Sequence, residues 1–185
     1  MTEQNTPELR FPGINDPWES STLNQITSIL KDGTHGTHKD SKEGPWLLSA
    51  KNLKNNKISI NEDDRKISKV DFDRIYKNYN LKRGDLLLSI VGTIGNVAIV
   101  KDPENIAFQR SVAILRMRNE FYNKFFLNLF QTHSFKKKLK RNQVVSAQPG
   151  IYLGDLGKLQ IKFPLNLKEQ KKLENSLANS TARLS

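Results

Sequence analysis

The two histidines of the segment DGTHGTHKD have a spacing that could bind a metal ion. His35 and His38 are three positions apart, and the neighbouring carboxylates are Asp32 and Asp40. Two glycines and polar neighbours break any regular period here, so the segment is predicted to be a loop of about ten residues. A loop with these few ligands and no cysteine defines no closed ligand set, and we therefore expect no metal site.

Two further patterns resemble catalytic sites only loosely. Gly92 and Gly95 are spaced like residues of a phosphate-binding loop, but the Walker and dinucleotide-binding patterns are both incomplete, and a tight turn is favoured. Asp155 with Glu169 and Lys171 loosely resembles a metal-dependent nuclease set, but the last two fall in a predicted helix and not on a rigid strand. Because cysteine, a methyl-donor loop and a distinguishable Ser/His/Asp set are all missing, we expect a chain that is not an enzyme and uses no cofactor.

The distribution of charge indicates a polyanionic partner. The 185 residues include 30 Lys and Arg against 19 Asp and Glu, a formal charge of +11, which favours association with nucleic acid. Residues 110–142 alone contain nine basic residues and one acidic residue. Five of the nine occupy six consecutive positions, namely Lys136, Lys137, Lys138, Lys140 and Arg141. Phosphates would relieve the repulsion between them, although a solvated helix face would have the same pattern.

The candidates for base contacts are polar residues beside predicted strands, because directional donors and acceptors read base edges. Arg110 can address guanine and Gln109 adenine in the major groove. Both could equally have a structural role and tie the start of a strand to a neighbouring glycine turn. The other candidates lie in polar stretches: Lys51, Asn52, His35, His38, Gln143 and Gln148.

A β-hairpin is the clearest element that could position these residues. Two β-rich runs, 86–91 and 96–100, are joined by the segment GTIG. The run 111–118 is predicted to be a strand buried on both faces, since its apolar residues do not strictly alternate with polar ones. The segments 46–53 and 57–60 are predicted to form short strands.

Three helices are predicted from apolar residues at helical spacing. Ser68 would cap the first, over residues 69–79, Asn119 the second, and Ser134 the third, over residues 134–142. The aromatic stripe of the second helix is typical of a core and not of a base-stacking surface. The residues expected to face inward are Val70, Ile75 and Tyr79, then Phe121, Tyr122, Phe125, Phe126, Leu129 and Phe130, then Phe135 and Leu139.

The chain is predicted to consist of an extended lead-in over residues 1–17, a compact domain over 18–164 and the start of an exposed helix over 165–185. The helix has one apolar seam, formed by Leu173, Leu177 and Leu184. Two heptads are too few for a stable coiled coil, so this helix either packs on the body or docks a partner and continues in a longer chain. Because apolar runs are short and a signal peptide is not evident, we expect a cytoplasmic protein that does not enter a membrane.

Several segments, taken in order, form a recognisable series: RFPGINDPWE, DGTHGTHK, PWLLSAKNL, LKRGDLLLSIVGTIGNVAIV, AFQRSVAIL, SAQPGIYLGDLGKLQIKFPL and LKEQKKL. In this order they resemble the target-recognition domain of the specificity subunit of type I restriction–modification systems. The most specific parts are the glycine hairpin over 84–100 and the predicted strand over 159–163, which reaches a proline and then E-Q-K before a helix. The sequence departs from the family at Asn166 and Leu167, where a second proline is common, and at Ser185, where a full subunit would continue into a second recognition domain.

The resemblance implies a mixed α/β domain that reads double-stranded DNA without catalysis. It further implies that the helix after Pro164 is a spacer and a docking site for methyltransferase subunits, and that the complex recruits a restriction subunit. One such domain would read one half-site only. Two origins stay open: a natural half-subunit that forms a homodimer through its C-terminal helix, or a piece of a longer subunit.

Two other functions are compatible with the residues. A general nucleic-acid binder would follow from the charge of +11 alone, and it would bind all duplexes of equal length alike. A docking or inhibitory fragment would occupy the methyltransferase subunit through the terminal helix without reading DNA.

Overall fold

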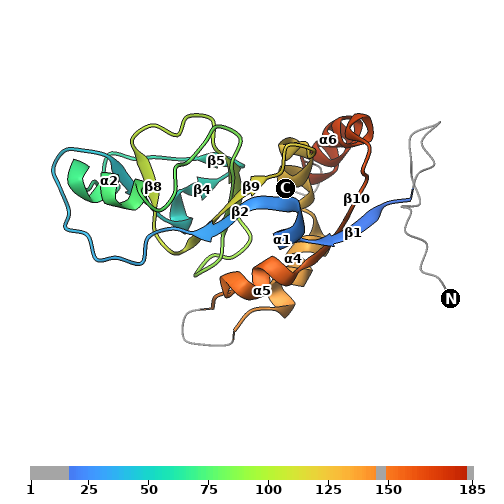
Figure 1. Cartoon of the computed structure of the whole chain (residues 1–185), viewed down its shortest axis with the longest axis horizontal. Coiled ribbons are helices and arrows are strands. Elements are labelled where there is room, and N and C mark those ends of the chain that lie inside the picture. Colours follow the sequence, from blue (N-terminus) through green and yellow to red (C-terminus); the bar gives the residue numbers. More distant parts are fainter. Residues whose placement is uncertain (1–16, 145–148, 183–185) are drawn as a thin grey trace.

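A four-stranded antiparallel sheet crosses the middle of the molecule (Figure 1). The computed structural model describes residues 17–144 and 149–182, with side chains as far as Glu174, so the predicted lead-in over 1–17 lies almost wholly outside the described residues. The strand order of the sheet is β2-β9-β6-β7, with these bounds: β2 Thr27–Asp32, β9 Val112–Met117, β6 Leu86–Ser89 and β7 Val97–Ile99.

Apolar side chains cover both faces of this sheet, and neighbours along one strand belong to different cores. Leu86 and Leu88 point into a first core, whereas Leu87 between them points into a second core. In β9, Leu115 belongs to the first core and Ile114 to the second. Successive side chains of a strand point to opposite faces, so a strand covered on both sides must be apolar almost throughout. The prediction that residues 111–118 form a strand buried on both faces is confirmed for Val112–Met117, whereas Arg118 is exposed.

The first core lies under helices and a two-stranded ribbon, at the right of the sheet in Figure 1. The aromatic stripe supplies its centre, since Phe125, Phe126 and Phe130 are fully buried, and the rings of Phe125 and Phe126 meet edge to face at 5.1 Å. Its elements are β1 Glu19–Thr22, α1 Leu23–Ile26, α3 Asn123–Leu129, α4 His133–Arg141, α5 Leu153–Lys158 and β10 Gln160–Phe163. Strands β1 and β10 pair antiparallel.

The second core lies under smaller elements at the left of Figure 1. They are β3 Trp46–Leu48, the 3-10 turn η1 Ala50–Asn52, β4 Leu53–Lys54, β5 Lys57–Ile58, α2 Lys69–Tyr76 and β8 Ile106–Phe108. Strands β3 and β8 pair parallel, and β4 pairs with β5 antiparallel. The short strands predicted over 46–53 and 57–60 are thus partly confirmed, with the 3-10 turn interrupting the first of them.

The turn between β6 and β7 requires its two glycines. Gly92 and Gly95 have φ angles of 77° and 92°, a region that a residue with a Cβ rarely adopts. Ser89 closes the turn from below: its carbonyl accepts a hydrogen bond from the N–H of Gly95, and its hydroxyl accepts one from the N–H of Asn96. The predicted hairpin is confirmed, and the glycine pair is a turn and not the start of a helix.

Two predicted helix caps are wrong. Helix α3 begins at Asn123 with Tyr122 as its N-cap, because the side chain of Gln170 accepts a hydrogen bond from the N–H of Tyr122 and holds the preceding residues, including Asn119, outside the helix. Helix α4 begins at His133, because the hydroxyl of Thr132, and not that of Ser134, accepts from the N–H of Phe135.

The predicted cap of the first helix is correct, but one of its inward residues is not. The Ser68 hydroxyl accepts from the N–H of Asp71, and α2 follows. Val70 is 68% exposed, whereas Phe72 and Ile75, three residues apart, face the second core. The inward face of α2 is therefore set by this pair, and a residue two positions before Phe72 must point to the other side.

The last helix, α6 Leu167–Ala182, packs on α3. Gln170 is fully buried and donates to the carbonyl of Pro164 in addition to its bond with Tyr122, while Glu169 accepts from the indole N–H of Trp18. Leu173 packs against the first core. Within the described ranges, no helix combines the length and apolar character that crossing a bilayer requires.

Candidate nucleic-acid interface

Helix α4 presents a cationic face outward because two apolar residues one turn apart hold its other face. Phe135 and Leu139 are buried in the first core. The predicted cations Lys136, Lys137, Lys140 and Arg141 are exposed, and within the described part of the chain none of them has a carboxylate partner. Lys138 differs: it is half-buried and donates to the carbonyl of Gln160 at 2.7 Å. We call the four exposed residues the α4 cations.

The glycine turn lies against this helix. A Cβ placed on Gly95 would lie 3.5 Å from Leu139 Cδ1 and 3.8 Å from Lys136 Cγ. The chain that follows α4 returns along the same hairpin: the N–H of Gly92 donates to Pro149 at 3.0 Å, and the N–H of Ile151 donates to the carbonyl of Ile90 at 2.9 Å. The turn, the α4 cations and the segment after α4 therefore form one continuous surface.

Arg110 is fixed to this surface by backbone contacts with the end of β2. Its N–H donates to the carbonyl of Thr34 at 3.1 Å, and the N–H of Thr34 donates to the carbonyl of Phe108 at 2.8 Å. Gly33 makes this approach possible, since a Cβ there would overlap the carbonyl oxygens of Phe108 and Gln109. The segment that carries His35 is thereby held directly beside Arg110.

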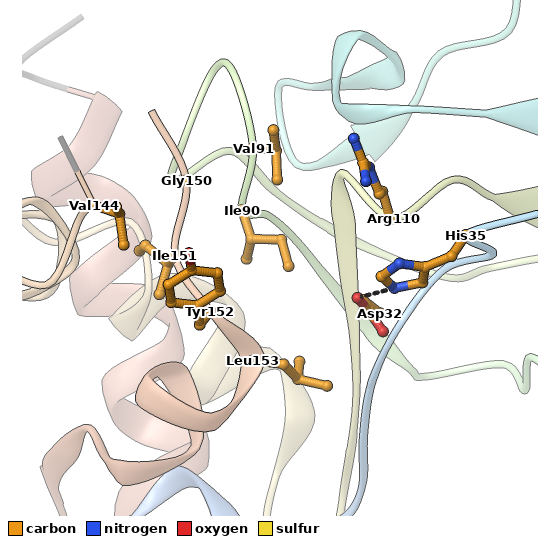
Figure 2. A pocket seen from close by; sticks show the side chains of 10 residues that line it. All are labelled: Asp32, His35, Ile90, Val91, Arg110, Val144, Gly150, Ile151, Tyr152 and Leu153. Atoms are coloured by element: carbon orange, nitrogen blue, oxygen red, sulfur yellow. Dashed lines mark hydrogen bonds and ion pairs between the residues drawn. The ribbon is translucent and has the colours of Figure 1, made fainter. Parts of the chain in front are cut away.

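A pocket of about 390 Å³ lies between this clamp and the segment that leads into α5 (Figure 2). Arg110, His35 and Asp32 form one wall, Ile151 and Tyr152 form the opposite wall, and the hairpin lies between them. The complete lining is Asp32, His35, Ile90, Val91, Arg110, Val144, Gly150, Ile151, Tyr152 and Leu153. The pocket therefore combines a polar wall with an apolar base, as sites for planar ligand groups often do.

The histidines of the predicted loop have different roles. His35 is exposed, and its Nε2 lies 2.5 Å from Asp32 Oδ2. The His38 side chain is 6% exposed; its Nε2 lies 2.9 Å from Thr34 Oγ1, and its Nδ1 lies 3.6 Å from Asp71 Oδ1. His38 thus anchors the loop to α2 and is withdrawn from the surface. Within the described residues, no group of three or more His, Asp or Glu side chains is placed to hold a metal ion.

The η1 turn places its two candidates differently. Asn52 is 1% exposed, and its amide donates to the carbonyl of Ser59 and to Asp64 Oδ2 at 2.7 Å, which is a structural placement. Lys51 is exposed and its ammonium lies 2.7 Å from Asp64 Oδ1, a hydrogen bond that raises the pKa of Lys51. The turn is next to Arg110, because the N–H of Ala50 donates to the hydroxyl of Ser111.

Asp64 holds this turn together as an ionised carboxylate. Burial by itself raises the pKa of Asp64, but hydrogen bonds from Lys51, from the N–H of Asn61 and from Asn52 outweigh it, so the pKa lies below its usual value. Every donor favours the charged form. The ionised carboxylate therefore links Lys51, Asn52 and the N–H of Asn61 at neutral pH.

The remaining candidates are only partly placed. Gln109 is half-buried and its N–H donates to the carbonyl of Leu48, next to Arg110. Gln143 is half-buried directly after α4. Three of the predicted residues lie outside the part of the chain that the structure describes. They are Gln148, Leu184 and, for its side chain, Leu177.

Tyr152 and Asp32 are residues that sequence reasoning missed. Tyr152 is 67% exposed on the wall of the pocket opposite Arg110, although it lies in the apolar run IYLG that suggests burial. Asp32 entered the sequence reasoning only as a metal ligand, yet here it orients His35. The spacing of an acid three residues before a histidine was the available signal for Asp32. For Tyr152 the sequence contains none.

Comparison with known proteins agrees with this geometry. The EcoBI specificity subunit, part of a type I restriction enzyme of Escherichia coli, is 28% identical over 120 residues, which are 63% of this chain and 25% of that protein. The S subunit of a type I restriction–modification system from M. genitalium has a TM-score of 0.65 at 20% identity, over 97% of this chain and 42% of its own. The HsdS subunit from Thermoanaerobacter tengcongensis has a TM-score of 0.60 at 18% identity, over 94% of this chain and 40% of its own.

The fold thus places the molecule in a class: mixed α/β domains of the kind found in S subunits. The chain spans less than half the length of each of these proteins. The family profile of the type I restriction modification DNA specificity domain matches residues 15–179, and the chain belongs to this family. The family resemblance stated from the sequence is confirmed.

Proposed function

We propose that the chain recognises one half-site of double-stranded DNA by sequence, as the specificity component of a type I restriction–modification assembly, and that it catalyses no reaction itself. The observation that carries this proposal is that the glycine turn lies against Lys136 of the α4 cations, while Val91 at the start of the same turn lines the pocket that contains Arg110. Family membership supports the proposal, since the family is defined as a DNA specificity domain.

The two parts of this surface suit different tasks. The α4 cations are three ammonium groups and a guanidinium that have no carboxylate partner among the described residues, so they can neutralise phosphates and fix the register of the domain on the duplex. Arg110 is held by backbone contacts and His35 by a hydrogen bond to Asp32, so they can address base edges with a defined direction. Phosphate contacts supply affinity, and the pocket supplies the choice of sequence.

Methyltransferase and restriction subunits are proposed as partners, with α6 as the docking element. The structure turns Leu173 toward the first core, so this leucine stabilises the domain and a partner would contact other parts of α6. Within the described side chains, the contacts of α6 with the body come from its first two turns, up to Glu174. A homodimer through the same helix is the alternative docking arrangement. Such an assembly would act on the DNA of the cytoplasm.

Selection of bound duplexes from a random pool tests the proposal. The whole chain, alone and with its methyltransferase subunit, should enrich duplexes that share one short half-site. Equal retention of all duplexes, with only salt controlling the affinity, would instead establish a general nucleic-acid binder. Co-purification with the methyltransferase subunit and no binding to any duplex, in the presence or absence of that subunit, would establish a docking fragment.

A further inference from the structure

We propose that Arg110 and His35 together read a single G·C base pair through its major-groove edge. The inference rests on the proposed function, because it presupposes that this surface meets duplex DNA. It assigns one base pair and its orientation to two named residues, whereas the proposed function assigns neither.

The two side chains start from segments that are bonded to each other. Arg110 donates its N–H to the carbonyl of Thr34, the residue before His35, and Gly33 donates its N–H to the carbonyl of Val112. Both side chains line the same wall of the pocket (Figure 2), and both are exposed. A shift of one segment would carry the other with it, so their relative placement is built into the fold.

Asp32 determines which nitrogen of His35 can accept a hydrogen bond. A carboxylate only accepts, so the contact of 2.5 Å between Asp32 Oδ2 and His35 Nε2 places the proton of the neutral ring on Nε2. Nδ1 is then an acceptor, and the His35 side chain is 62% exposed. Asp32 is a positioning residue in this arrangement, and it leaves Nδ1 of the exposed His35 ring available to a partner.

The resulting pattern matches one base pair. The guanidinium of Arg110 offers two parallel donors, which suit guanine N7 and O6, and Nδ1 of His35 offers one acceptor, which suits the N4 amine of the paired cytosine. An A·T pair presents a donor in the middle of its edge, where the Arg110 fork would need an acceptor. A reversed C·G pair presents the same groups in the opposite order. One orientation of G·C satisfies all three groups.

The apolar side chains of the pocket support the assignment of this base pair. Ile90 and Val91 of the hairpin lie between the polar wall and Ile151 on the opposite wall, and these apolar side chains would displace water from the contact. A hydrogen bond is electrostatically stronger where water is excluded, and a mismatched polar group there is left unpaired. Exclusion of water therefore strengthens binding to the matched base pair and weakens binding to a mismatched one, and both effects increase sequence discrimination.

The experiment measures the affinity of the whole chain for its selected duplex and for every single base-pair replacement of it. Arg110→Ala and His35→Ala should each flatten discrimination at the same G·C pair, by roughly 5- to 150-fold, the range of a good base contact. Arg110→Lys keeps the charge but loses the fork, so it should lose the discrimination and keep the salt dependence. Both replaced residues, Arg110 and His35, are exposed in the wild type, so the thermal midpoint of the three variants should not change.

Base analogues separate the two contacts. Replacing that guanine with 7-deazaguanine should weaken the wild type and leave Arg110→Ala unaffected. Replacing the cytosine with N4-methylcytosine should weaken the wild type and leave His35→Ala unaffected. Lys101→Ala removes an exposed cation of a separate hollow and should change neither response.

Two results would overturn the inference. A wild-type chain that selects a sequence, while both alanine variants keep full discrimination or lose it at different base pairs, would refute it and leave the proposed function intact. A wild-type chain without any sequence preference would refute the proposed function and this inference with it.

Discussion

Neutralising the α4 cations should reduce the salt dependence of DNA binding by an amount that the structure limits. The variant replaces all four with glutamine: Lys136, Lys137, Lys140 and Arg141. Glutamine has nearly the helix propensity of lysine, and the buried anchors Phe135 and Leu139 are unchanged, so α4 should remain folded. Every duplex should lose affinity alike, because phosphates carry no sequence information.

The size of the effect follows from the number of available charges. Each phosphate contact contributes about 0.9 to the slope of log affinity against log salt, so four contacts contribute up to about 3.6. Lys138 is excluded from this number because the carbonyl of Gln160 already holds its ammonium at 2.7 Å. Lys138→Gln alone should therefore leave the slope nearly unchanged.

Anisotropy titrations of a labelled duplex at several salt concentrations measure the slope. A matched control replaces four exposed cations at the open end of the hairpin, opposite the glycine turn: Lys77, Lys82, Arg83 and Lys101. The control should change the slope much less. The same slope in the α4 variant and the wild type, or an equal reduction in the control, would refute the assignment of phosphates to α4.

Three further predictions concern stability. Arg116→Ala should lower the free energy of unfolding, measured in urea, by about 3–5 kcal/mol, because it leaves the buried carboxylate of Asp85 without its cation. That carboxylate is 2% exposed, and the Arg116 guanidinium donates two hydrogen bonds to it, at 2.7 and 2.8 Å. A smaller loss in the double variant Arg116→Ala/Asp85→Ala would support this reason, and a wild-type urea midpoint in Arg116→Ala would contradict it. Gly33→Ala should lower the free energy of unfolding by about 1–3 kcal/mol, because the added Cβ would overlap two backbone carbonyl oxygens. It should also weaken the preference for one DNA sequence. Thermal unfolding and competition binding measure the two effects, and wild-type stability would show that the contact between residues 33–34 and 108–110 can open. Asp64 has a pKa in the folded state below its ordinary 3.8, so the ionised carboxylate stabilises the fold fully above that pH, and this stabilisation is lost as the pH falls through the folded-state pKa. The difference in the free energy of unfolding between the wild type and Asp64→Asn should therefore shrink between pH 5 and strongly acidic pH. A constant difference would argue against an ionised Asp64.

The strands and the aromatic core could be predicted because their signals are local. The glycine pair at 92 and 95 and the apolar run of 112–115 each allow one structure with little influence from the rest of the chain. The predicted start of α3 was wrong for the opposite reason. The N–H of Tyr122 is satisfied by Gln170, 48 residues later, and a partner so distant in sequence leaves no local mark.

The candidate site was predictable in its charge and not in its arrangement. Five cations in six consecutive positions are visible in the sequence, but the separation of Lys138 from the others depends on the carbonyl of Gln160 in another element. Asn52 has a side-chain amide of the kind that contacts bases, yet in the interior this amide donates hydrogen bonds to Asp64 and to the carbonyl of Ser59. Burial and pairing of polar groups are tertiary properties, and for these residues they decide the role.

The anchorage of helix α6 has a geometric consequence for anything attached to it. Trp18 and Tyr122 hold Glu169 and Gln170, so the direction of the helix axis is set by the domain itself. Each residue added beyond that anchorage would advance the attached part by about 1.5 Å and rotate it by about 100°. Distance and orientation therefore change together, and insertions of about seven, eleven or eighteen residues would nearly restore the original orientation at successively greater distances.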